Sequence, residues 1–386
     1  MRVLVDDSAA FNQGAGIGRY ARNILPAAAR LMPESTFSLV YAPSYRGPSP
    51  YHSDVIDAFP NPGNVKVTRL PFGRRRADQL WFRARLPLRP QWFAGRADVA
   101  FSPDFTLPPV GRIPRAITIH DLAYEIFPDK TSPALRAYLT MIVPKQIALA
   151  SRVVAVSQTT KQDLIERMGV DEGRISVVLN GVEERFFAAK PLTSNRRSAL
   201  RIPRDYLLIV GTIEPRKNHL NLFKAMQLLD RRVDLPLVVA GRRGWEDDSI
   251  MKEASRLSDQ GKVILVDYVP DADLPGLYAG ACAVVYPSWY EGFGLPVAEA
   301  LASGVPVVAS TAAALKETGG DRAIYCEPSA PESIADGIEQ AVREEVRTDE
   351  ATAARQAHAR MFDWDRSGTA LVTVLRQLAS ERPGDE

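Results

Sequence analysis

The sequence predicts an α/β protein built from parallel sheets that are covered by helices. Short apolar runs rich in β-branched residues alternate with amphipathic stretches along the whole chain, which is typical of repeated strand–helix–strand units. The chain has 386 residues, of which 46% are hydrophobic and 24% are charged, an ordinary globular composition. This length is sufficient for two domains that each bury a core.

Short apolar runs mark the expected strands, and each run is followed by a turn. In the first half of the chain they are Arg2–Val5, Phe37–Tyr41, Val65–Arg69, Val99–Phe101, Arg115–Ile119, Arg152–Val156 and Ile175–Val178. In the second half they are Tyr206–Val210, Pro236–Ala240, Lys262–Leu265, Ala283–Tyr286, Val305–Ala309 and Ala323–Cys326.

A polar stretch without periodicity, residues 188–197, separates the two sets of strands and is the expected linker. We therefore expect a first domain over residues 1–187 and a second over residues 198–362. Apolar residues recur at helical spacing near the end of the chain, which predicts a closing helix over about residues 364–386. The residues that set this spacing are Leu371, Val374, Leu375 and Leu378.

The formal net charge of +2 hides an asymmetry between the two halves. Residues 1–190 hold 25 Lys and Arg against 17 Asp and Glu, whereas residues 191–386 hold 23 against 29. This division suggests that the first half meets an anionic surface or acceptor.

Cysteine use and hydropathy indicate the compartment. Only Cys282 and Cys326 are present, which excludes a disulfide framework and favours a reducing cytosol. The segment Met1–Asp7 is too short and too acidic for a signal peptide, and no apolar stretch reaches the roughly 20 residues of a membrane-spanning helix. We expect a cytoplasmic protein.

Two glutamates, Glu291 and Glu299, stand eight positions apart around the start of a predicted helix. Pro296 suits the first turn of that helix, and Gly292 and Gly294 let the backbone approach a ligand. Free amides at a helix start favour phosphate, and carboxylates accept hydrogen bonds from hydroxyls. A nucleotide sugar has both groups. The alternative is an ordinary strand–turn–helix unit.

The run Glu291-Gly-Phe-Gly-Leu-Pro-Val-Ala-Glu299 resembles the Glu-x7-Glu motif of retaining GT-B glycosyltransferases of family 4. The resemblance extends over most of the chain. It implies two Rossmann-like domains with parallel sheets facing a central cleft, and a closing helix that packs back on the first domain. It also implies that Glu299 holds the ribose hydroxyls and that Glu291 holds the hexose. The backbone amides expected to assist Glu291 are those of Gly292, Phe293, Gly294 and Leu295.

A basic pair, Arg216 and Lys217, follows the predicted strand Tyr206–Val210 and precedes Asn218, a plausible N-cap. Two cations at a helix start can hold a diphosphate and stabilise it as it departs. The alternative is a solvated basic pair on a loop. In the family, the matching pair holds the diphosphate without a metal.

A glycine-rich stretch, Gly14-Ala-Gly16-Ile-Gly18-Arg19, follows the first strand. The dinucleotide fingerprint fails here because Arg19 occupies the position of its third glycine. The resemblance implies instead a loop in which the backbone at Gly16 approaches the donor phosphate or the acceptor. A tight strand-to-helix turn remains the alternative for Gly14 and Gly18.

His120 follows the β-branched run Ile117-Thr-Ile, at the carboxyl end of a predicted strand where open α/β sheets bind ligands. The family has a histidine at this place, lying against the transferred sugar. Asp121 orients either the turn or the imidazole. The residues expected at the catalytic centre are therefore His120, Arg216, Lys217 and Glu291.

Val269 lies in a segment similar to the one whose backbone meets the base in the family. The nearby Asp271-Ala-Asp273 matches a metal-binding pattern of a different glycosyltransferase fold, but Pro275 follows closely, so Asp273 is interpreted as a helix N-cap. We expect no metal and no cofactor.

The resemblance implies a metal-independent retaining hexosyltransferase that acts in glycan, polysaccharide or glycolipid synthesis. The stretch around His120, with Ile126-Phe-Pro-Asp129, is most similar to bacterial mannosyltransferases of surface polysaccharides. This favours GDP-mannose as donor, with a UDP-sugar as the alternative, and a glycan or lipid-linked acceptor. No nucleic-acid partner is expected. Two other functions stay open: a GT-B sugar phosphorylase or nucleotide-sugar epimerase, and a non-catalytic subunit that binds sugar nucleotides.

Residues 72–93 hold six arginines and five aromatic residues, with Asp78 the only acid. Arginines attract anionic lipid head groups, and Trp and Phe can enter the membrane interface. This composition predicts that the segment docks the protein on an anionic membrane, as a peripheral protein on the inner face of that membrane. The alternative is a solvated basic helix whose aromatic side chains pack inward.

Overall fold

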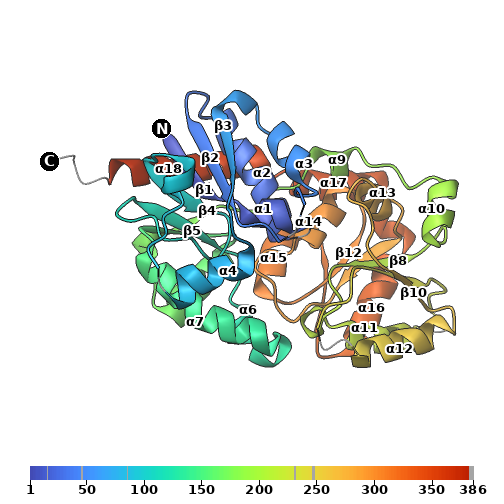
Figure 1. Ribbon diagram of the computed structural model, residues 1–386. Coiled ribbons are helices and arrows are strands. Elements are labelled where there is room, and N and C mark those ends of the chain that lie inside the picture. The colour runs from blue at the N-terminus through green and yellow to red at the C-terminus, as the bar shows by residue number, and fades with distance from the viewer. Residues whose placement is uncertain (15, 45–46, 85, 230–231, 246–247, 382–386) are drawn as a thin grey trace. The chain divides into compact units, whose positions relative to one another are not determined.

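The computed structural model describes residues 1–14, 16–44, 47–84, 86–229, 232–245 and 248–381. The chain divides into two compact units (Figure 1). Unit 1 comprises Met1–Leu122, Ala137–Gly181 and the C-terminal segment from Asp363, and unit 2 comprises Ala123–Arg136 and Val182–Phe362.

Unit 1 is built on a parallel sheet with seven strands among the described residues, in the order β3-β2-β1-β4-β5-β6-β7. The register pairs Val3 with both Phe37 and Val99. The strands are β1 (Arg2–Asp6), β2 (Thr36–Tyr41), β3 (Val65–Arg69), β4 (Val99–Ser102), β5 (Arg115–Ile119), β6 (Arg152–Ala155) and β7 (Ile175–Val177).

Helices cover this sheet, and the last helix of the chain is one of them. Helix α18 packs against α2, and the fit is close: a Cβ added at Gly368 would lie 2.7 Å from the backbone of Ala27. The helical elements are α1 (Ser8–Asn12), α2 (Ile17–Arg30), α3 (His52–Asp57), η1 (Pro62–Asn64), α4 (Arg74–Asp78), η2 (Gln79–Arg83), α5 (Gln91–Ala94), α7 (Pro133–Leu149), α8 (Gln158–Met168), η4 (Glu172–Arg174) and α18 (Trp364–Ser380). The first four residues of α7, up to Arg136, belong to unit 2. The end of the predicted closing helix, residues 382–386, lies outside the described part of the chain.

Unit 2 repeats the plan with six parallel strands among its described residues, in the order β10-β9-β8-β11-β12-β13. The strands are β8 (Leu207–Val210), β9 (Leu237–Ala240), β10 (Val263–Val266), β11 (Ala283–Tyr286), β12 (Val307–Ser310) and β13 (Ile324–Cys326). The helical elements are α6 (Ala123–Ile126), η3 (Pro128–Lys130), α9 (Glu184–Phe187), α10 (Ser194–Leu200), η5 (Pro215–Lys217), α11 (His219–Leu228), α12 (Asp248–Ser258), α13 (Leu274–Ala279), α14 (Leu295–Ala302), α15 (Ala313–Gly319), α16 (Pro331–Ala341), η6 (Glu344–Val346) and α17 (Asp349–Ala359).

Each expected strand is present, with ends that differ by at most two residues, the usual uncertainty of strand limits. The central strands β4, β9, β11 and β12 are buried along their whole length, which explains their continuous apolar sequences. Both sheets reverse their strand order beside the first strand, as in doubly wound folds. Ligands bind such sheets at the carboxyl ends of the strands next to this reversal.

Two segments that connect the strands have features that the order of the elements does not show. Part of the expected linker is helical, because the hydroxyl of Thr193 caps α10 by accepting a hydrogen bond from the amide of Arg196. The segment Ala123–Arg136 follows β5 of unit 1 in the chain but clusters with unit 2. In the described part of the chain, no helix is both long and apolar enough to span a membrane.

Candidate active site

The basic pair and the first glutamate meet at the carboxyl ends of β8 and β11, which are neighbours in the sheet of unit 2. The loop after β8 leads into η5, which carries Arg216 and Lys217. The loop after β11 carries Glu291 and leads into α14. Because β8 and β11 flank the reversal of strand order, this is the place where the fold predicts a ligand.

Glu291 lies between the two cations. Its Oε2 is 2.9 Å from Nη1 of Arg216, and its Oε1 is 2.6 Å from Nζ of Lys217. Arg216 also reaches Oε1 of Glu214 at 2.8 Å and donates to the carbonyl oxygen of Tyr290 at 2.8 Å. The cluster therefore holds two cations and two carboxylates, and it is neutral when no ligand is bound.

Burial and charge set the protonation states in this cluster. Burial alone would raise the pKa of Glu291, but Arg216 and Lys217 outweigh it and lower that pKa to about 2. Burial lowers the pKa of Lys217, and repulsion by Arg216 acts in the same direction, against the attraction of Glu291. Glu291 is thus ionised across the physiological range, and its charge holds the two cations in place.

Tyr286 was not singled out by the sequence, yet it contacts Lys217. Nζ of Lys217 donates a hydrogen bond to the Tyr286 hydroxyl and lies 4.8 Å from the ring centroid. Burial, followed by the charge of Glu291, raises the pKa of Tyr286 well above its usual value, so the phenol stays neutral. Its position as the last residue of β11 was the only available signal.

The loop before α14 has the expected backbone features. Gly294 is the N-cap residue with a φ of 98°, a conformation that favours glycine, and a Cβ there would lie 2.5 Å from Cδ2 of Leu315. The carbonyl oxygen of Phe293 accepts a hydrogen bond from Thr318, which anchors the loop. Helix α14 begins at Leu295; Pro296 in its first turn has no amide hydrogen, and the amide of Val297 donates to the carbonyl oxygen of Gly294 at 2.9 Å.

Glu299 lies one turn into α14, as the spacing predicted, and is only 1% exposed. It therefore follows the ion-pair cluster closely in the chain, on the helix that begins beside it. A buried carboxylate on this helix needs a polar environment, because burial of a charge without hydrogen bonds is costly. Its assignment to the ribose remains a prediction.

Asn218 occupies the N-cap position of α11 but does not cap the helix with its side chain. Its Nδ2 instead donates to the carbonyl oxygens of Pro287, at 3.0 Å, and Pro328, at 2.7 Å. The expectation of a side-chain cap is wrong because the residue has a left-handed conformation, with a φ of 62°. The amide thereby ties η5 to the loop after β11.

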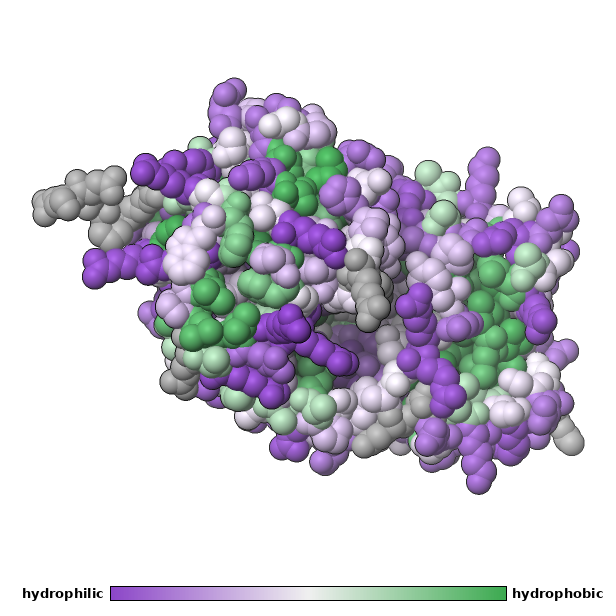
Figure 2. Space-filling model, in the orientation of Figure 1, coloured by the Kyte–Doolittle hydropathy of each residue, from purple (hydrophilic) through white to green (hydrophobic). Residues whose placement is uncertain are grey.

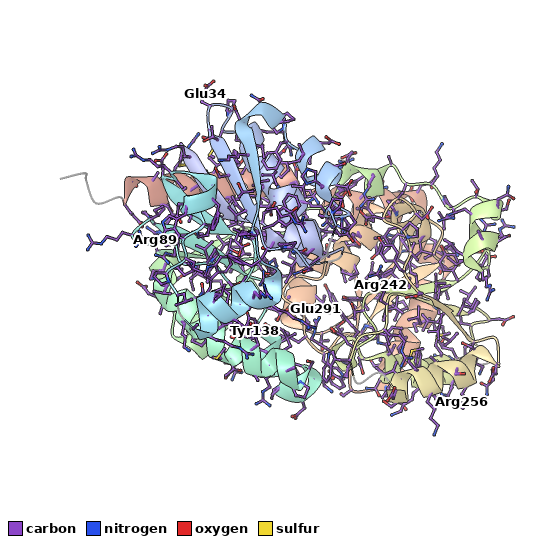
Figure 3. The ribbon with its side chains drawn as sticks, viewed as in Figure 1. Glu34, Arg89, Tyr138, Arg242, Arg256 and Glu291 are labelled. Atoms are coloured by element: carbon purple, nitrogen blue, oxygen red, sulfur yellow. The ribbon has the colours of Figure 1, made fainter. Side chains whose placement is uncertain are left out.

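Val269 is buried in the loop after β10, beside an exposed aromatic residue, Tyr268. The guanidinium of Arg242, which follows β9, lies 4.4 Å from the ring centroid of Tyr268. Figure 3 labels Arg242 and Glu291, which come from different loops of unit 2. The structure thus adds a cation and a planar ring near Val269, and its contact with the base remains a prediction.

His120 belongs to unit 1, at the end of β5. Its Nε2 lies 2.8 Å from the carbonyl oxygen of Pro103, so Nε2 carries the proton and Nδ1 is the acceptor in the neutral ring. The edge of the ring packs on Tyr20, with 5.0 Å between centroids. Burial lowers the pKa of His120, although Asp104 and Asp121 oppose the shift, so the ring is neutral near pH 7.

Gly16, also in unit 1, is the N-cap residue of α2. Its φ of 47° and ψ of −107° suit glycine, and a Cβ at this position would meet no atom within 4 Å. The need for glycine therefore comes from backbone conformation and not from crowding. Gly18 differs, since a Cβ there would lie 2.0 Å from the carbonyl oxygen of Gln13, which fits the tight turn.

Comparison with known proteins agrees with this geometry. Residues 193–359 match the family described as "Glycosyl transferases group 1", and residues 14–186 match "Glycosyltransferase Family 4". The O-antigen chain mannosyltransferase B of Escherichia coli is 33% identical over 282 residues, which are 72% of this chain and 73% of that protein. The chain belongs to the family 4 glycosyltransferases.

One further curated protein and two solved structures are also similar to this glycosyltransferase. The O-antigen chain mannosyltransferase RfbU of Salmonella typhimurium is 30% identical over 58% of this chain and 60% of that protein. Sucrose-phosphate synthase from Thermosynechococcus elongatus superposes with a TM-score of 0.75 at 17% identity, over 99% of both chains. Anabaena HepE, solved with UDP and glucose, superposes with a TM-score of 0.71 at 20% identity, over 98% of this chain and 100% of that one. The predicted two-domain GT-B fold is confirmed.

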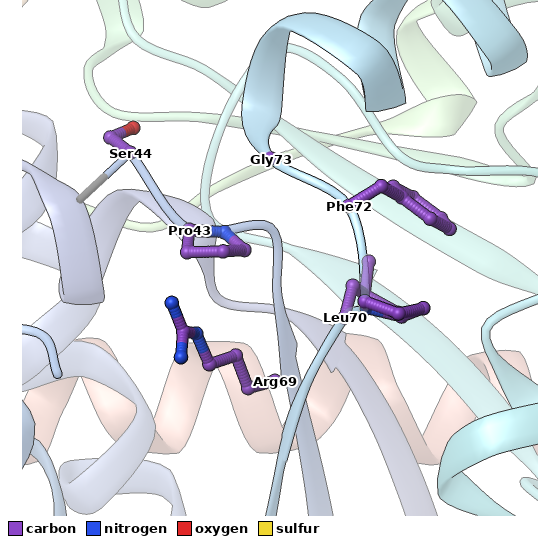
Figure 4. Close-up of a pocket in the computed structure, with 7 residues that line it drawn as sticks. Pro43, Ser44, Arg69, Leu70, Phe72 and Gly73 are labelled. Carbon is purple, nitrogen blue, oxygen red and sulfur yellow. The ribbon is translucent and has the colours of Figure 1, made fainter. Parts of the chain in front are cut away.

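The glycosyltransferase also has a pocket in unit 1, of about 570 Å³, that contains none of the predicted site residues. It lies at the carboxyl ends of β2 and β3, and Figure 4 shows Arg69 beside Pro43 at its wall. Its lining residues are Pro43, Ser44, Arg69, Leu70, Pro71, Phe72 and Gly73. The pocket therefore adjoins the start of the basic aromatic segment.

A bound metal ion needs several ligating side chains in one place. No group of three or more His, Cys, Asp or Glu side chains in the described ranges is arranged to hold one. Asp273, which belonged to the Asp-x-Asp pattern, lies at the N-cap position of α13 but does not cap the helix with its side chain, which instead accepts a hydrogen bond from Nε of Arg196 at 3.0 Å. Lys217 and Arg216 already occupy the carboxylate oxygens of Glu291.

Proposed function

We propose that this glycosyltransferase moves a hexose, with mannose favoured, from a nucleoside diphosphate sugar to an acceptor hydroxyl with retention of configuration and without a metal. The observation that carries the proposal is the ion-pair cluster of Arg216 with the buried Lys217 and Glu291, beside the start of α14. A diphosphate needs cations, and this place offers two. The names of the relatives, both O-antigen mannosyltransferases, support mannose and a glycan acceptor.

Donor binding requires an exchange of partners in this cluster. In the free enzyme Glu291 neutralises Arg216 and Lys217. When the diphosphate arrives, its oxygens take over these cations, and the carboxylate of Glu291 becomes available to the hydroxyls of the sugar. Glu299 accepts hydrogen bonds from the ribose, the amides of Gly292–Leu295 assist Glu291, and the backbone near Val269 meets the base.

In the transfer step, the bond between the anomeric carbon and the phosphate oxygen breaks while the acceptor oxygen bonds to that carbon. The acceptor proton passes to the departing phosphate on the same face, so no protein nucleophile is required. Arg216 and Lys217 stabilise the negative charge that grows on the diphosphate. His120, neutral and with Nδ1 as an acceptor, lies on the acceptor side of the transferred carbon, and Gly16 lets the backbone approach the phosphate.

A thermal-shift series with GDP, UDP and ADP tests the donor, since a ligand that binds only the native state raises the apparent stability. We expect the largest shift with GDP, and transfer from GDP-mannose that survives EDTA. Sugar release with no acceptor present, to phosphate or to water, would favour the phosphorylase or epimerase alternative. Binding without any turnover would favour the non-catalytic subunit.

We also propose that residues 72–93 dock the enzyme on the inner face of an anionic membrane that carries the acceptor. Trp81 and Phe82 are buried, as the alternative requires, but Trp92 is 63% exposed and Phe93 is 43% exposed. Figure 3 shows Arg89 extending away from the ribbon, and Figure 2 shows a surface that is mostly hydrophilic with smaller apolar areas. The arginines of this segment that the structure shows as exposed are Arg75, Arg76, Arg83 and Arg89. Arg85 lies outside the described residues.

Sedimentation with liposomes that contain anionic lipid decides this part of the proposal. Binding should fall with salt, and it should fall when Arg75 and Arg76 are changed to Ser or when Trp92 is changed to Ser. The matched control is Trp81→Phe, which alters a buried aromatic residue of the same segment. Absence of binding at low salt would indicate a soluble acceptor.

A further inference from the structure

The segment Ala123–Arg136 has no role in the function proposed so far, although it contains the Ile126-Phe-Pro-Asp129 stretch. The segment begins three residues after His120 and belongs to unit 2, whereas His120 belongs to unit 1. It contains α6, η3 and the first residues of α7, and the hydroxyl of Thr131 donates to the carbonyl oxygen of Phe127 at 3.3 Å. The segment is thus ordered by its own hydrogen bonds.

This segment contacts the loop that carries Glu291. The ring of Phe127 lies 5.8 Å from the ring of Tyr290, measured between centroids, at an interplanar angle of 39°. Nζ of Lys130 lies 4.5 Å from the ring centroid of Trp289. Two adjacent rings of the loop are therefore each held by one residue of the segment.

The same two loop residues hold Arg216 through their backbones. The amide of Trp289 donates to the carbonyl oxygen of Arg216 at 3.0 Å, and the carbonyl oxygen of Tyr290 accepts from Nη1 of Arg216 at 2.8 Å. Glu291 follows directly in the chain and pairs with the same Nη1 at 2.9 Å. A shift of the loop would move both the carboxylate and the partner of the guanidinium.

We propose that Phe127 and Lys130 are positioning residues of the donor site: they hold the Trp289–Tyr290 loop so that Arg216 and Glu291 meet the diphosphate sugar in one geometry. Misplacement of binding groups by even a small distance weakens catalysis, because the reacting groups must be held near their productive positions. This inference rests on the proposed function. It adds two residues that act on the cluster indirectly. The ion pairs that the structure shows for Arg216, Lys217 and Glu291 involve neither of them.

The variants Phe127→Ala and Lys130→Gln test the proposal. An aromatic pair and a cation–π contact are each modest interactions, so we expect each variant to lower kcat/KM for the donor by about three- to tenfold and to weaken binding of GDP by a similar factor. Lys130→Arg keeps a cation over the ring and should restore both values. A merely structural role would lower the melting temperature without this rescue and without a change in GDP binding by the folded protein.

A matched control is available in unit 2. The guanidinium of Arg360 lies 3.7 Å from the ring centroid of Phe187, the same kind of contact at a place that carries no predicted donor-site residue. Arg360→Gln should leave the GDP affinity and kcat/KM within about twofold of the unmodified enzyme, as surface substitutions usually do. An equal effect of Arg360→Gln and Lys130→Gln would overturn the proposal.

A double-mutant cycle identifies the contact that matters. If Lys130 acts through Trp289, the effect of Lys130→Gln on GDP affinity disappears in a Trp289→Leu background, whereas additive effects would overturn the proposal. The cycle is also run on thermal unfolding without any ligand, which measures the Lys130–Trp289 contact independently of activity. If the unmodified protein bound none of GDP, UDP and ADP, the proposed function would be overturned, and this inference with it. This would hold even if the unfolding cycle showed coupling between Lys130 and Trp289.

Discussion

Replacement of Glu291 by glutamine separates its two proposed roles. In the free enzyme the carboxylate is a counter-ion for Arg216 and Lys217, at 2.9 and 2.6 Å. In the donor complex it is proposed to hold the sugar. Glu291→Gln keeps the size of the side chain and removes the charge, so the neutral cluster acquires a net charge of one positive unit.

The expected result is tighter binding of the plain nucleoside diphosphate and poorer use of the diphosphate sugar. A unit charge at 4 Å is worth about 4 kcal/mol at an effective dielectric constant of 20. At about three times this separation the same charge is worth ~1.4 kcal/mol, which is about tenfold in GDP affinity, and we take this as the expected gain. Turnover should fall, because a neutral amide binds the sugar hydroxyls less strongly than a carboxylate.

Isothermal titration with GDP and steady-state kinetics with the donor measure the two effects. The matched control is Glu299→Gln, a buried glutamate on the following helix, which should weaken GDP binding by about tenfold or more because a hydrogen bond to a charged group is lost. Thermal unfolding should show that Glu291→Gln is less stable than the unmodified enzyme. Loss of the carboxylate leaves the cations partly buried without their counter-ion, which costs desolvation energy. GDP should then restore more stability to this variant than to the unmodified enzyme.

Weaker GDP binding by Glu291→Gln would refute this reasoning. It would mean that Glu291 positions the cations for the diphosphate more than it competes with it. Equal losses in Glu291→Gln and Glu299→Gln would also remove the division between a sugar glutamate and a ribose glutamate.

Three further predictions concern the surroundings of this cluster. Arg216→Ala or Lys217→Ala should lower kcat by about 10²–10³-fold. The activity of the unmodified enzyme should survive EDTA. If chelation abolished this activity and magnesium restored it, the metal-free mechanism would be contradicted. Tyr286→Phe removes the hydroxyl that accepts from Lys217 and should lower kcat by about three- to tenfold, with little change in the fold; an unchanged pH profile and rate would show that the hydroxyl is dispensable. Burial lowers the pKa of His219 to about 4, so its contribution to stability is present above about pH 6.5 and is lost as the pH falls toward 4. The unmodified protein should therefore lose about 3 kcal/mol more than His219→Phe between these pH values in urea titrations, and parallel pH slopes would contradict this.

The strands and the start of α14 could be predicted because their signals are local. A strand of a parallel sheet that is buried on both faces needs an unbroken apolar run, and this pattern is visible without knowledge of which strands are its neighbours. Ala283–Tyr286 is such a run, and its predicted limits are those observed. Gly294 and Pro296 likewise mark the start of a helix through their own backbone preferences, and the structure begins α14 at Leu295.

The partners of the site residues could not be predicted, because they depend on which strands are neighbours. Lys217 and Tyr286 are 69 positions apart and meet only because β8 and β11 are adjacent in the sheet. Asn218 was predicted to cap its own helix, but its left-handed backbone sends the side chain to Pro287 and Pro328. Neither contact leaves a periodic trace in the sequence.

The sequence by itself determined the fold class and the family, and it singled out the charged residues of the proposed donor site. The tertiary structure alone decided which of those charges neutralise each other, and which aromatic residues of the basic segment are buried, Trp81, or exposed, Trp92. It also assigned Ala123–Arg136 to unit 2, although the segment follows a strand of unit 1. The physical reason is the range of the interactions: hydrophobic periodicity and backbone preference act over a few residues, whereas ion pairing and burial depend on chain segments that only the completed sheet brings together.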